Sequence, residues 1–405
     1  MESPADRLAE PPAWALDAPA RKLLDALGPE ARFVGGCVRD ALIGAAPADL
    51  DLGVPYPPEE TVARLKRAKL RAIPTGIAHG TVTAAIEGRN FEVTSLRRDV
   101  ETFGRHARVA FGADWREDAA RRDFTINALS MAPDGALYDY FGGRADLAAR
   151  RVRFIGDARA RIGEDVLRLL RFFRFHARFG GDAFDPPGLA ACRACAASLP
   201  GLSAERVRAE MFRLIEGPRA AAMLAAMREA GALAHWLPEA DGPALARLAS
   251  LARFEAAAGE PPDAIRALAV FDLDARNFAA RWRLSNAEGA RLARLRAPPA
   301  RVTLDADAPA TRRAFYALGV DLRDRVLIDA ADFTDVAAAL ERHRRAQAWT
   351  RPTFPVGGAD LRALGIEPGP GFGELLHKIE STWIASDFAA SKESLLELAK
   401  NAARA

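Results

Sequence analysis

The sequence predicts a mixed α/β region at the N-terminus followed by an all-helical remainder. Short segments between residues 30 and 96 alternate polar and apolar side chains and are separated by glycines, as half-buried strands are. From about residue 145 onward, almost every segment has helical spacing. β-Branched residues, which favour strands, become sparse after about residue 155. Because 405 residues exceed one ordinary core, we expect several domains.

The first region is predicted to form a small mixed sheet with flanking helices. A short amphipathic helix over 14–27 precedes a strand at 32–34, which stops at a Gly-Gly pair. A helix at 37–43, a strand at 49–54 and a helix at about 58–70 follow. Two further strands, 81–87 and 90–96, are separated by Gly88-Arg89 and read as a hairpin.

The next segments are predicted with less regular structure and then with helices. Residues 97–112 are polar and contain glycine, which predicts a mobile loop. A helix is predicted over 117–129. Later helices are separated by breaker pairs such as Pro186-Pro187 and Pro298-Pro299.

Composition and charge are those of a soluble globular protein. Half of the residues are apolar, 27% are charged and the net charge is +3. The N-terminus has no apolar run, and no stretch of about twenty apolar residues occurs, so we expect a cytoplasmic protein without a membrane span. Residues 144–178 contain ten arginines and four acids. This basic stretch is either a solvated helix face or a surface for polyphosphate or nucleic acid.

Two aspartates in the predicted strand 49–54 are the candidate metal ligands. Asp49 and Asp51 are two residues apart, so on a strand their carboxylates point to one face. Carboxylate oxygens suit Mg²⁺, which borrows further ligands from substrate phosphates. The two carboxylates can share one or two such ions and so support attack by a hydroxyl and departure of pyrophosphate. Glu92 in strand 90–96 is a candidate third carboxylate, although an ordinary surface glutamate is the alternative.

A Gly-Gly turn just upstream predicts a phosphate cradle. Gly35 and Gly36 join a strand to a helix, and such a turn offers backbone N–H groups to an anion. Arg39 adds a cation beside this turn. A D-x-D strand and a Gly-Gly turn are each common in structural roles, but their order and spacing together favour a functional site.

Five segments in order resemble the tRNA nucleotidyltransferase and bacterial poly(A) polymerase family. The resemblance covers about residues 30–215. It is carried by Gly35-Gly36-Cys37-Val38-Arg39-Asp40 with Gly44 and Asp49-Leu50-Asp51, by Arg121-Arg122-Asp123-Phe124-Thr125-Ile126-Asn127-Ala128, by Asp139-Tyr140-Phe141-Gly142-Gly143 with Asp146-Leu147, by Glu164-Asp165-Val166-Leu167-Arg168, and by Ser203-Ala204-Glu205-Arg206 with Glu210.

The resemblance implies an α/β nucleotidyltransferase head over residues 1–142, a helical neck over 143–216 and a helical, tRNA-binding body and tail over 217–405. It implies an enzyme that adds C, C and A to the tRNA 3′ end from CTP and ATP, with Mg²⁺ and without a template strand. The segment FPVGGADLRALGIEPGPGFGELLHKIESTW also resembles the tail of such enzymes in some bacteria. No membrane and no protein partner are implied.

The resemblance also implies residues that select the nucleotide. Arg122 and Asp123, side by side at a helix start, would select ribose, since a carboxylate accepts from a 2′-hydroxyl while an arginine holds phosphate. An ordinary salt-bridge cluster is the alternative.

Asp165 and Arg168 are the implied substitute for a template base. They are three residues apart, which on a helix places them one turn apart on one face. Cytosine and adenine both offer an amine donor beside a ring acceptor, whereas guanine and uracil offer a carbonyl where the amine is needed. Arg171 and Arg174 continue the row and could hold the triphosphate, unless the row is an ordinary basic face.

Two related activities and one remote alternative remain open at this stage. A poly(A) polymerase usually has a basic-aromatic segment after the second aspartate, and TGIAHGTVTA has none. An enzyme that adds only C-C lacks a loop element that residues 97–112 resemble. Phe103 and Ala48 depart from the family pattern, where an acid and a lysine are frequent. A non-catalytic RNA-binding protein would have lost a carboxylate or the template pair, and all of these residues are present.

Overall fold

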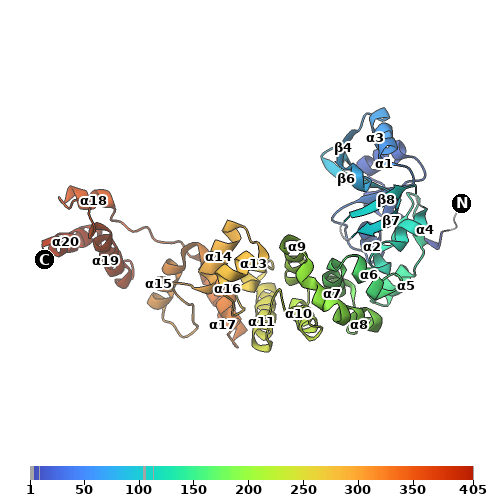
Figure 1. Cartoon of the computed structure of the whole chain (residues 1–405). Helices are drawn as coiled ribbons and strands as arrows, with labels where there is room; N and C mark the ends of the chain where they lie inside the picture. Colours follow the sequence, from blue (N-terminus) through green and yellow to red (C-terminus); the bar gives the residue numbers. More distant parts are fainter. Residues whose placement is uncertain (1–3, 9, 104–105, 113, 405) are drawn as a thin grey trace. The chain divides into compact units, whose positions relative to one another are not determined.

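The chain folds into two compact units (Figure 1). The computed structural model describes residues 4–8, 10–103, 106–112 and 114–404. Residues 1–219 and 226–236 form the first unit, and residues 220–225 and 237–405 form the second. The predicted head and neck therefore lie together in the first unit. Its sheet and the helical character of the rest of the chain confirm the predicted fold class.

The first unit contains an eight-stranded mixed sheet in the order β1-β10-β9-β2-β3-β6-β5-β4. Among these pairs only β3 and β6 run parallel, and Asp51 lies opposite Glu92 in their register. The strands are β1 (Asp6–Arg7), β2 (Arg32–Val34), β3 (Asp51–Val54), β4 (Arg71–Gly76), β5 (Thr81–Ile86), β6 (Arg89–Ser95), β9 (Leu129–Met131) and β10 (Ala136–Asp139). β3, which begins with Asp51, is thus an interior strand.

Several of these strands were not predicted, and one predicted helix is wrong. The segment 117–129 holds helix α4 (Trp115–Ala120), a short 3₁₀ turn (Thr125–Asn127) and the start of β9. β9 pairs with the neighbouring β10 and with β2, which is distant in sequence, so backbone pairing in the sheet overrides the local helical pattern. β1, β4 and β10 were also missed. The partner of β1 is the distant β10, whereas β4 and β10 pair with the neighbouring strands β5 and β9, so a distant partner explains only the first of these omissions.

The core of the sheet lies against helix α1 (Ala18–Leu27), which begins where the Asp17 carboxylate accepts the Ala20 N–H at 2.9 Å. Its Leu23 and Leu27 are fully buried in one cluster with Leu52 of β3. Helix α3 (Pro58–Arg67) adds Leu65 to the same cluster. Each such side chain contributes about 1.5–3 kcal/mol on burial. This core holds β2 and β3 rigidly beneath the candidate site.

The predicted loop 97–112 is instead a β-hairpin. β7 (Arg97–Phe103) pairs antiparallel with β8 (His106–Phe111), while residues 104–105 lie outside the described residues. The backbone of Phe103 pairs with that of His106 at the far end of the hairpin. A polar alternation without a clear apolar face looks like loop in sequence, but a hairpin satisfies its backbone through the partner strand.

Five helices complete the first unit: α5 (Gly143–Ala148), α6 (Ala158–Glu164), α7 (Leu167–Phe179), α8 (Pro186–Cys195) and α9 (Ala204–Ile215). An aromatic cluster fixes α7 against the segment after α4. The ring centroids of Phe124 and Phe154 are 4.8 Å apart, and those of Phe154 and Phe172 are 5.4 Å apart. All three rings are fully buried. The packed rings therefore fix the position of α7 and of the side chains that it contributes to the cleft described below.

The C-terminus of α7 is capped by one arginine from a distant segment. Arg219 Nε donates to the carbonyl of Ala177 at 3.1 Å, and its Nη1 donates to that of Gly181 at 2.8 Å. Its Nη2 donates to the carbonyls of His176 and of Gly180, the latter at 2.9 Å. The last carbonyls of a helix lack intrahelical partners and carry partial negative charge, so this guanidinium offsets both deficits.

We expect Arg219→Ala to lower the free energy of unfolding by about 2–3 kcal/mol, since buried carbonyls lose a charged donor. Urea unfolding followed by circular dichroism measures this change. Arg193→Ala is the matched control, because Arg193 is exposed in the last turn of α8 and a loss within about 0.5 kcal/mol is expected. Equal losses for the two variants would contradict the capping role.

The second unit is helical throughout its described part. Its helices are α11 (Gly242–Ala258), α12 (Ala264–Leu268), α13 (Ala275–Trp282), α14 (Asn286–Arg296), α15 (Ala308–Leu318), α16 (Leu322–Ala330), α17 (Val336–Ala348), α18 (Gly358–Ala363), α19 (Phe372–Ala385) and α20 (Lys392–Arg404). α10 (Ala220–Glu229) contributes residues to both units. None of the described helices is long and apolar enough to cross a membrane.

Candidate active site

Ten of the twelve predicted site residues line one cleft of about 650 Å³ in the first unit. The cleft lies among the Gly-Gly turn, the start of β3, the segment after α4, and helices α7 and α9. The ten residues are Gly35, Gly36, Arg39, Asp49, Asp51, Arg122, Asp123, Asp165, Arg168 and Arg171. Glu92 and Arg174 are not among its lining residues.

Two carboxylates stand at the sheet side of this cleft. Asp51 is the first residue of β3, and Asp49 lies in the bend before it rather than on the strand as predicted. The pKa of Asp51 is raised to about 6, chiefly by burial and then by the nearby Glu92 and Asp49 carboxylates, while Arg122 offsets part of the rise. A divalent cation beside Asp51 would favour the ionised form of its carboxylate.

The fit of a metal ion at this place depends on the two aspartates and on a substrate. Among the described residues, no group of three or more His, Cys, Asp or Glu side chains is gathered closely enough to hold a metal. Mg²⁺ accepts such sparse protein ligation because it keeps waters and takes phosphate oxygens as ligands. Glu92 lies beside Asp51 in the parallel pair β3–β6, and its role as a third carboxylate stays a prediction.

The first residue of the Gly-Gly turn has to be glycine for a steric reason. Gly35 has φ +71°, and a Cβ there would lie 2.8 Å from Arg122 Nη1. Any larger residue would both strain the backbone and displace the Arg122 side chain from the cleft. The glycine thus makes room for a neighbouring guanidinium as well as exposing backbone at the turn.

Arg39 is the cation predicted beside the turn, and protein groups hold its guanidinium in place. Arg39 is 6% exposed, and its guanidinium donates to the Asp40 carboxylate at 2.7 Å and to Asn127 Oδ1 at 2.6 Å. It also lies 4.1 Å from the centre of the Phe179 ring. With most of its donors engaged by protein groups, Arg39 acts first as part of the cleft wall.

Asp123 lines the cleft, and it follows the end of α4 instead of standing at a helix start as predicted. Arg122 and Asp123 follow the end of α4. The Asp123 carboxylate accepts from Asn127 Nδ2 at 2.9 Å and from Arg171 Nε at 2.7 Å. Burial opposes its ionisation, but Arg171 and Asn127 outweigh burial and hold the pKa of Asp123 below its usual value. It is therefore a fixed anionic acceptor.

The two predicted base-selecting residues line the cleft, although they do not share a helix as predicted. Asp165 lies in the extended link between α6 and α7, and Arg168 is in the first turn of α7. Asp165 accepts from Arg206 Nη2 at 2.7 Å. Arg168 donates to Glu164 and, through Nη2, to the backbone carbonyl of Arg121 at 3.1 Å. The break between the helices lets the carboxylate and the guanidinium face one space without neutralising each other.

Two further arginines of α7, Arg171 and Arg174, are held by a buried acid. Glu210 of α9 is 4% exposed and accepts from Arg174 Nε at 2.6 Å. Its other oxygen lies 3.6 Å from Arg171 Nη1. Arg171 therefore lies between Asp123 and Glu210 and lines the cleft, whereas Arg174 lies outside its lining.

Some lining residues were given no role by the sequence reasoning. They are Arg121, Asn127, Leu167, Phe175, Arg206 and Arg213. Arg206 and Asp165 are 41 residues apart, so their ion pair is invisible in local sequence. Arg206 lies in the fifth segment that resembles the family, and its place in that segment is the one feature of the sequence that could have indicated a role in the site.

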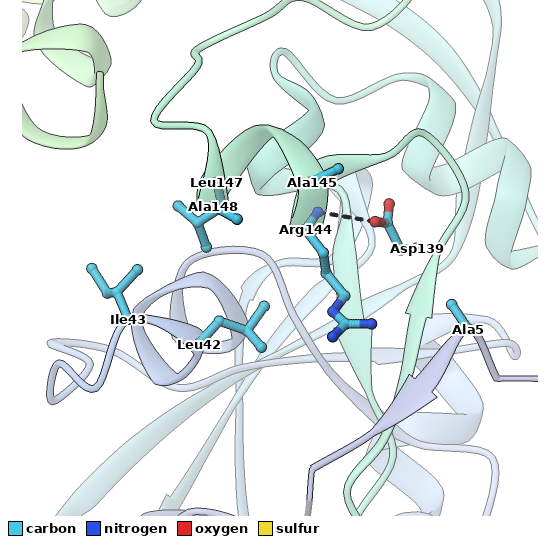
Figure 2. A pocket seen from close by; sticks show the side chains of 8 residues that line it. All are labelled: Ala5, Leu42, Ile43, Asp139, Arg144, Ala145, Leu147 and Ala148. Carbon is cyan, nitrogen blue, oxygen red and sulfur yellow. Dashed lines mark hydrogen bonds between the residues drawn. The ribbon is translucent and has the colours of Figure 1, made fainter. Parts of the chain in front are cut away.

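A second hollow, of about 570 Å³, lies where the end of α2 (Gly36–Leu42) approaches α5 (Figure 2). Its walls are mostly aliphatic, from Leu42, Ile43 and Leu147 among others. Asp139 is the acid in its lining, and it already accepts the backbone N–H of Arg144 at 2.9 Å, drawn as a dashed line. The chemistry of a charged nucleotide therefore favours the first cleft.

Comparison with known proteins agrees with this geometry. Residues 31–153 match the model of the poly A polymerase head domain, and residues 183–242 match that of the probable RNA and SrmB-binding site of polymerase A. The mitochondrial CCA tRNA nucleotidyltransferase 1 of Danio rerio is 37% identical over 91% of this chain and 86% of its own length. The chain belongs to the CCA-adding tRNA nucleotidyltransferase family.

Further relatives extend this finding across nearly the whole chain. The CCA-adding enzyme of Latilactobacillus sakei is 32% identical, over 96% of this chain and 98% of its own length. The crystal structure of the Bacillus stearothermophilus CCA-adding enzyme in complex with CTP superimposes with a TM-score of 0.76 at 27% identity, covering 96% of this chain and 98% of that one. The resemblance drawn from the five motifs is confirmed, and the protein is a nucleotidyltransferase.

Proposed function

We propose that this chain rebuilds the 3′ end of tRNA by adding C, C and A from CTP and ATP, with Mg²⁺ and without a template strand. One observation carries the proposal: the aspartate pair and the Asp165/Arg168 pair, more than a hundred residues apart, line the same cleft. The first pair suits phosphoryl transfer and the second suits reading of a base edge. Family members named CCA-adding enzymes support the same activity.

In this proposal the sheet side of the cleft carries the chemistry. Asp49 and Asp51 bind Mg²⁺, which when bound supplies charge neutralisation at the triphosphate and favours the deprotonated 3′-hydroxyl. The guanidinium groups of Arg171 and Arg122 contact the phosphates. Arg174 lies outside the cleft lining and shares the Glu210 carboxylate with Arg171. Asp123 accepts from the ribose, and Gly35-Gly36 permit close approach of the phosphates. Catalysis then consists mainly of positioning and charge stabilisation of the attack on the α-phosphorus.

Base choice is assigned to the opposite side of the cleft. The Asp165 carboxylate accepts from the exocyclic amine of cytosine or adenine, and Arg168 donates to a ring acceptor. Guanine and uracil would direct a carbonyl oxygen at the carboxylate, and this unpaired contact costs them binding. The ion pair of Asp165 with Arg206 and that of Arg168 with Glu164 hold these two base-selecting side chains in place.

The rest of the chain serves the tRNA in this proposal. We assign residues 1–142 to the catalytic head, 143–216 to the neck and 217–405 to a body and tail that bind tRNA, in the cytoplasm. Since arginines would contact phosphates, the affinity for tRNA is expected to fall steeply with salt.

Incorporation of labelled CTP and ATP tests the proposal on three tRNAs: one without CCA, one ending in C-C and one with CCA complete. We expect stepwise extension of the first two and no extension of the third. Cytidine addition alone would identify a C-C-adding enzyme and direct attention to Phe103 in the hairpin. Long adenosine tails on unrelated RNA would identify a poly(A) polymerase, and no incorporation with RNA binding intact would leave a non-catalytic RNA-binding protein.

A further inference from the structure

One buried carboxylate behind the cleft has no role in the chemistry described above. Asp118, in the middle of α4, is 4% exposed and is not among the residues that line the cleft. Burying an ionised carboxylate is costly unless charged donors surround it. The groups that Asp118 gathers therefore indicate what its burial achieves.

The carboxylate of Asp118 holds two side chains of the cleft wall. Its Oδ1 accepts from Arg121 Nε at 3.0 Å and Arg121 Nη2 at 2.8 Å. Its Oδ2 accepts from Arg122 Nη2 at 3.2 Å. Both arginines line the cleft. Burial opposes ionisation of Asp118, but Arg122 and Arg121 outweigh it and keep its pKa below the usual value.

Two further contacts extend this arrangement. Asp118 Oδ1 also lies 3.4 Å from the backbone N–H of Arg97, the first residue of the β7–β8 hairpin. The backbone carbonyl of Arg121 accepts from Arg168 Nη2 at 3.1 Å. The Asp118 carboxylate thus contacts Arg97 at the start of the hairpin and Arg122 in the cleft wall. It also holds Arg121, whose carbonyl accepts from Arg168.

The helix that carries Asp118 is itself firmly attached to the sheet. The guanidinium of Arg32 in β2 lies 4.2 Å from the Trp115 ring centre and 3.5 Å from that of Tyr138. Trp115 also packs so closely on β3 that a Cβ at Gly53 would lie 2.9 Å from it. α4 is therefore a rigid support, and Asp118 can transmit that rigidity to the arginines.

We propose that Asp118 is a positioning residue for nucleotide selection. Its carboxylate orients Arg122 toward the ribose and phosphates. It also holds the side chain of Arg121, the residue whose backbone carbonyl accepts from Arg168, and it ties both arginines to the root of the β7–β8 hairpin. The inference rests on the proposed function, since it assigns the selection of ribose over deoxyribose to the Arg122 side of the cleft.

Asp118→Asn tests this role because it keeps the shape and removes the charge. We expect the KM for CTP to rise about tenfold and the preference for CTP over dCTP to fall about tenfold, the loss of one charge-assisted contact. The kcat at saturating CTP should change less than KM, because the aspartates at β3 are untouched. Steady-state incorporation into a tRNA lacking CCA, with CTP and with dCTP, gives these values.

The matched control is Asp329→Asn in the second unit. Asp329 is also 4% exposed, and it accepts from the Arg325 side chain and from the backbone N–H of Val302 at 2.8 Å. Both variants should melt at lower temperature, but Asp329→Asn should leave the KM for CTP and the CTP/dCTP preference unchanged. If Asp118→Asn loses only thermal stability, as the control does, the positioning role is overturned.

A double variant separates action through Arg122 from an independent effect. In an Arg122→Ala background, Asp118→Asn should change the CTP/dCTP preference by less than about twofold, because the side chain that it orients is already absent. Effects that multiply fully would overturn the coupling. Failure of the wild-type chain to extend tRNA would instead defeat the proposed function, so the two failures are distinguishable.

Discussion

Asp51→Asn is expected to reduce nucleotide incorporation by about 10³-fold or more, while tRNA binding stays within about twofold of the wild type. The carboxylate is one of the two aspartates that we propose as ligands of the divalent cation, and metal ions supply several kcal/mol of charge stabilisation in such reactions. Incorporation of labelled CTP with Mg²⁺, beside a filter-binding assay for tRNA, measures both quantities.

The same variant should melt at a higher temperature than the wild type when no metal is added. Burial, Glu92 and Asp49 all disfavour the charged form of Asp51, so its charge destabilises the folded protein at neutral pH. Asparagine removes that charge and keeps the shape. A residue that active sites need for catalysis often lowers the stability of the fold, and Asp51 is expected to behave in this way.

Asp25→Asn is the control, since Asp25 lies on the exposed side of α1, away from the cleft. It should leave both incorporation and melting temperature close to the wild type. An Asp51→Asn enzyme that keeps a tenth of its activity, or that loses tRNA binding in parallel with its fold, would contradict the assignment of Asp51 as a metal ligand.

Arg168→Ala is expected to lower the preference for CTP over UTP by about 10²-fold, equivalent to about 2–3 kcal/mol. Removing the guanidinium leaves a ring acceptor of the correct base unpaired, so the correct nucleotide loses the contact that distinguishes it. The Mg²⁺ concentration at half-maximal activity should stay the same, because Asp49 and Asp51 are unchanged. Incorporation kinetics with each nucleotide on tRNA lacking CCA measure the preference.

The fold is expected to survive this change. Glu164 still accepts from Arg161 Nη1 at 2.7 Å after Arg168 is removed, so no buried acid is left without a partner. Arg159→Ala provides the control, since Arg159 is an exposed arginine of α6 outside the cleft lining. Unchanged nucleotide preference in Arg168→Ala would refute base selection by this residue, and an equal loss in Arg159→Ala would indicate a general effect of charge.

The early elements were accessible from the sequence because their signals are local. Alternating segments ending at Gly-Gly and Gly-Arg pairs predicted β2, β5 and β6 within about a residue of their observed bounds. Helical spacing between proline pairs predicted the helical remainder. β9 was missed because Leu129–Met131 becomes a strand by pairing with β2, which is far away in sequence. β4 and β10 were missed although their partners β5 and β9 are close in sequence.

By itself the sequence determined the family, the fold class and ten of the residues that meet in one cleft, because side-chain type and spacing carry that information. The tertiary structure alone decided how those residues are used. Arg39 became a buried wall residue once Asp40 and Asn127 reached it, and Asp165 separated from the helix of Arg168. Ion pairs such as Asp123 with Arg171 and Asp165 with Arg206 join residues far apart in sequence, so they depend on which charged groups the packed chain brings together.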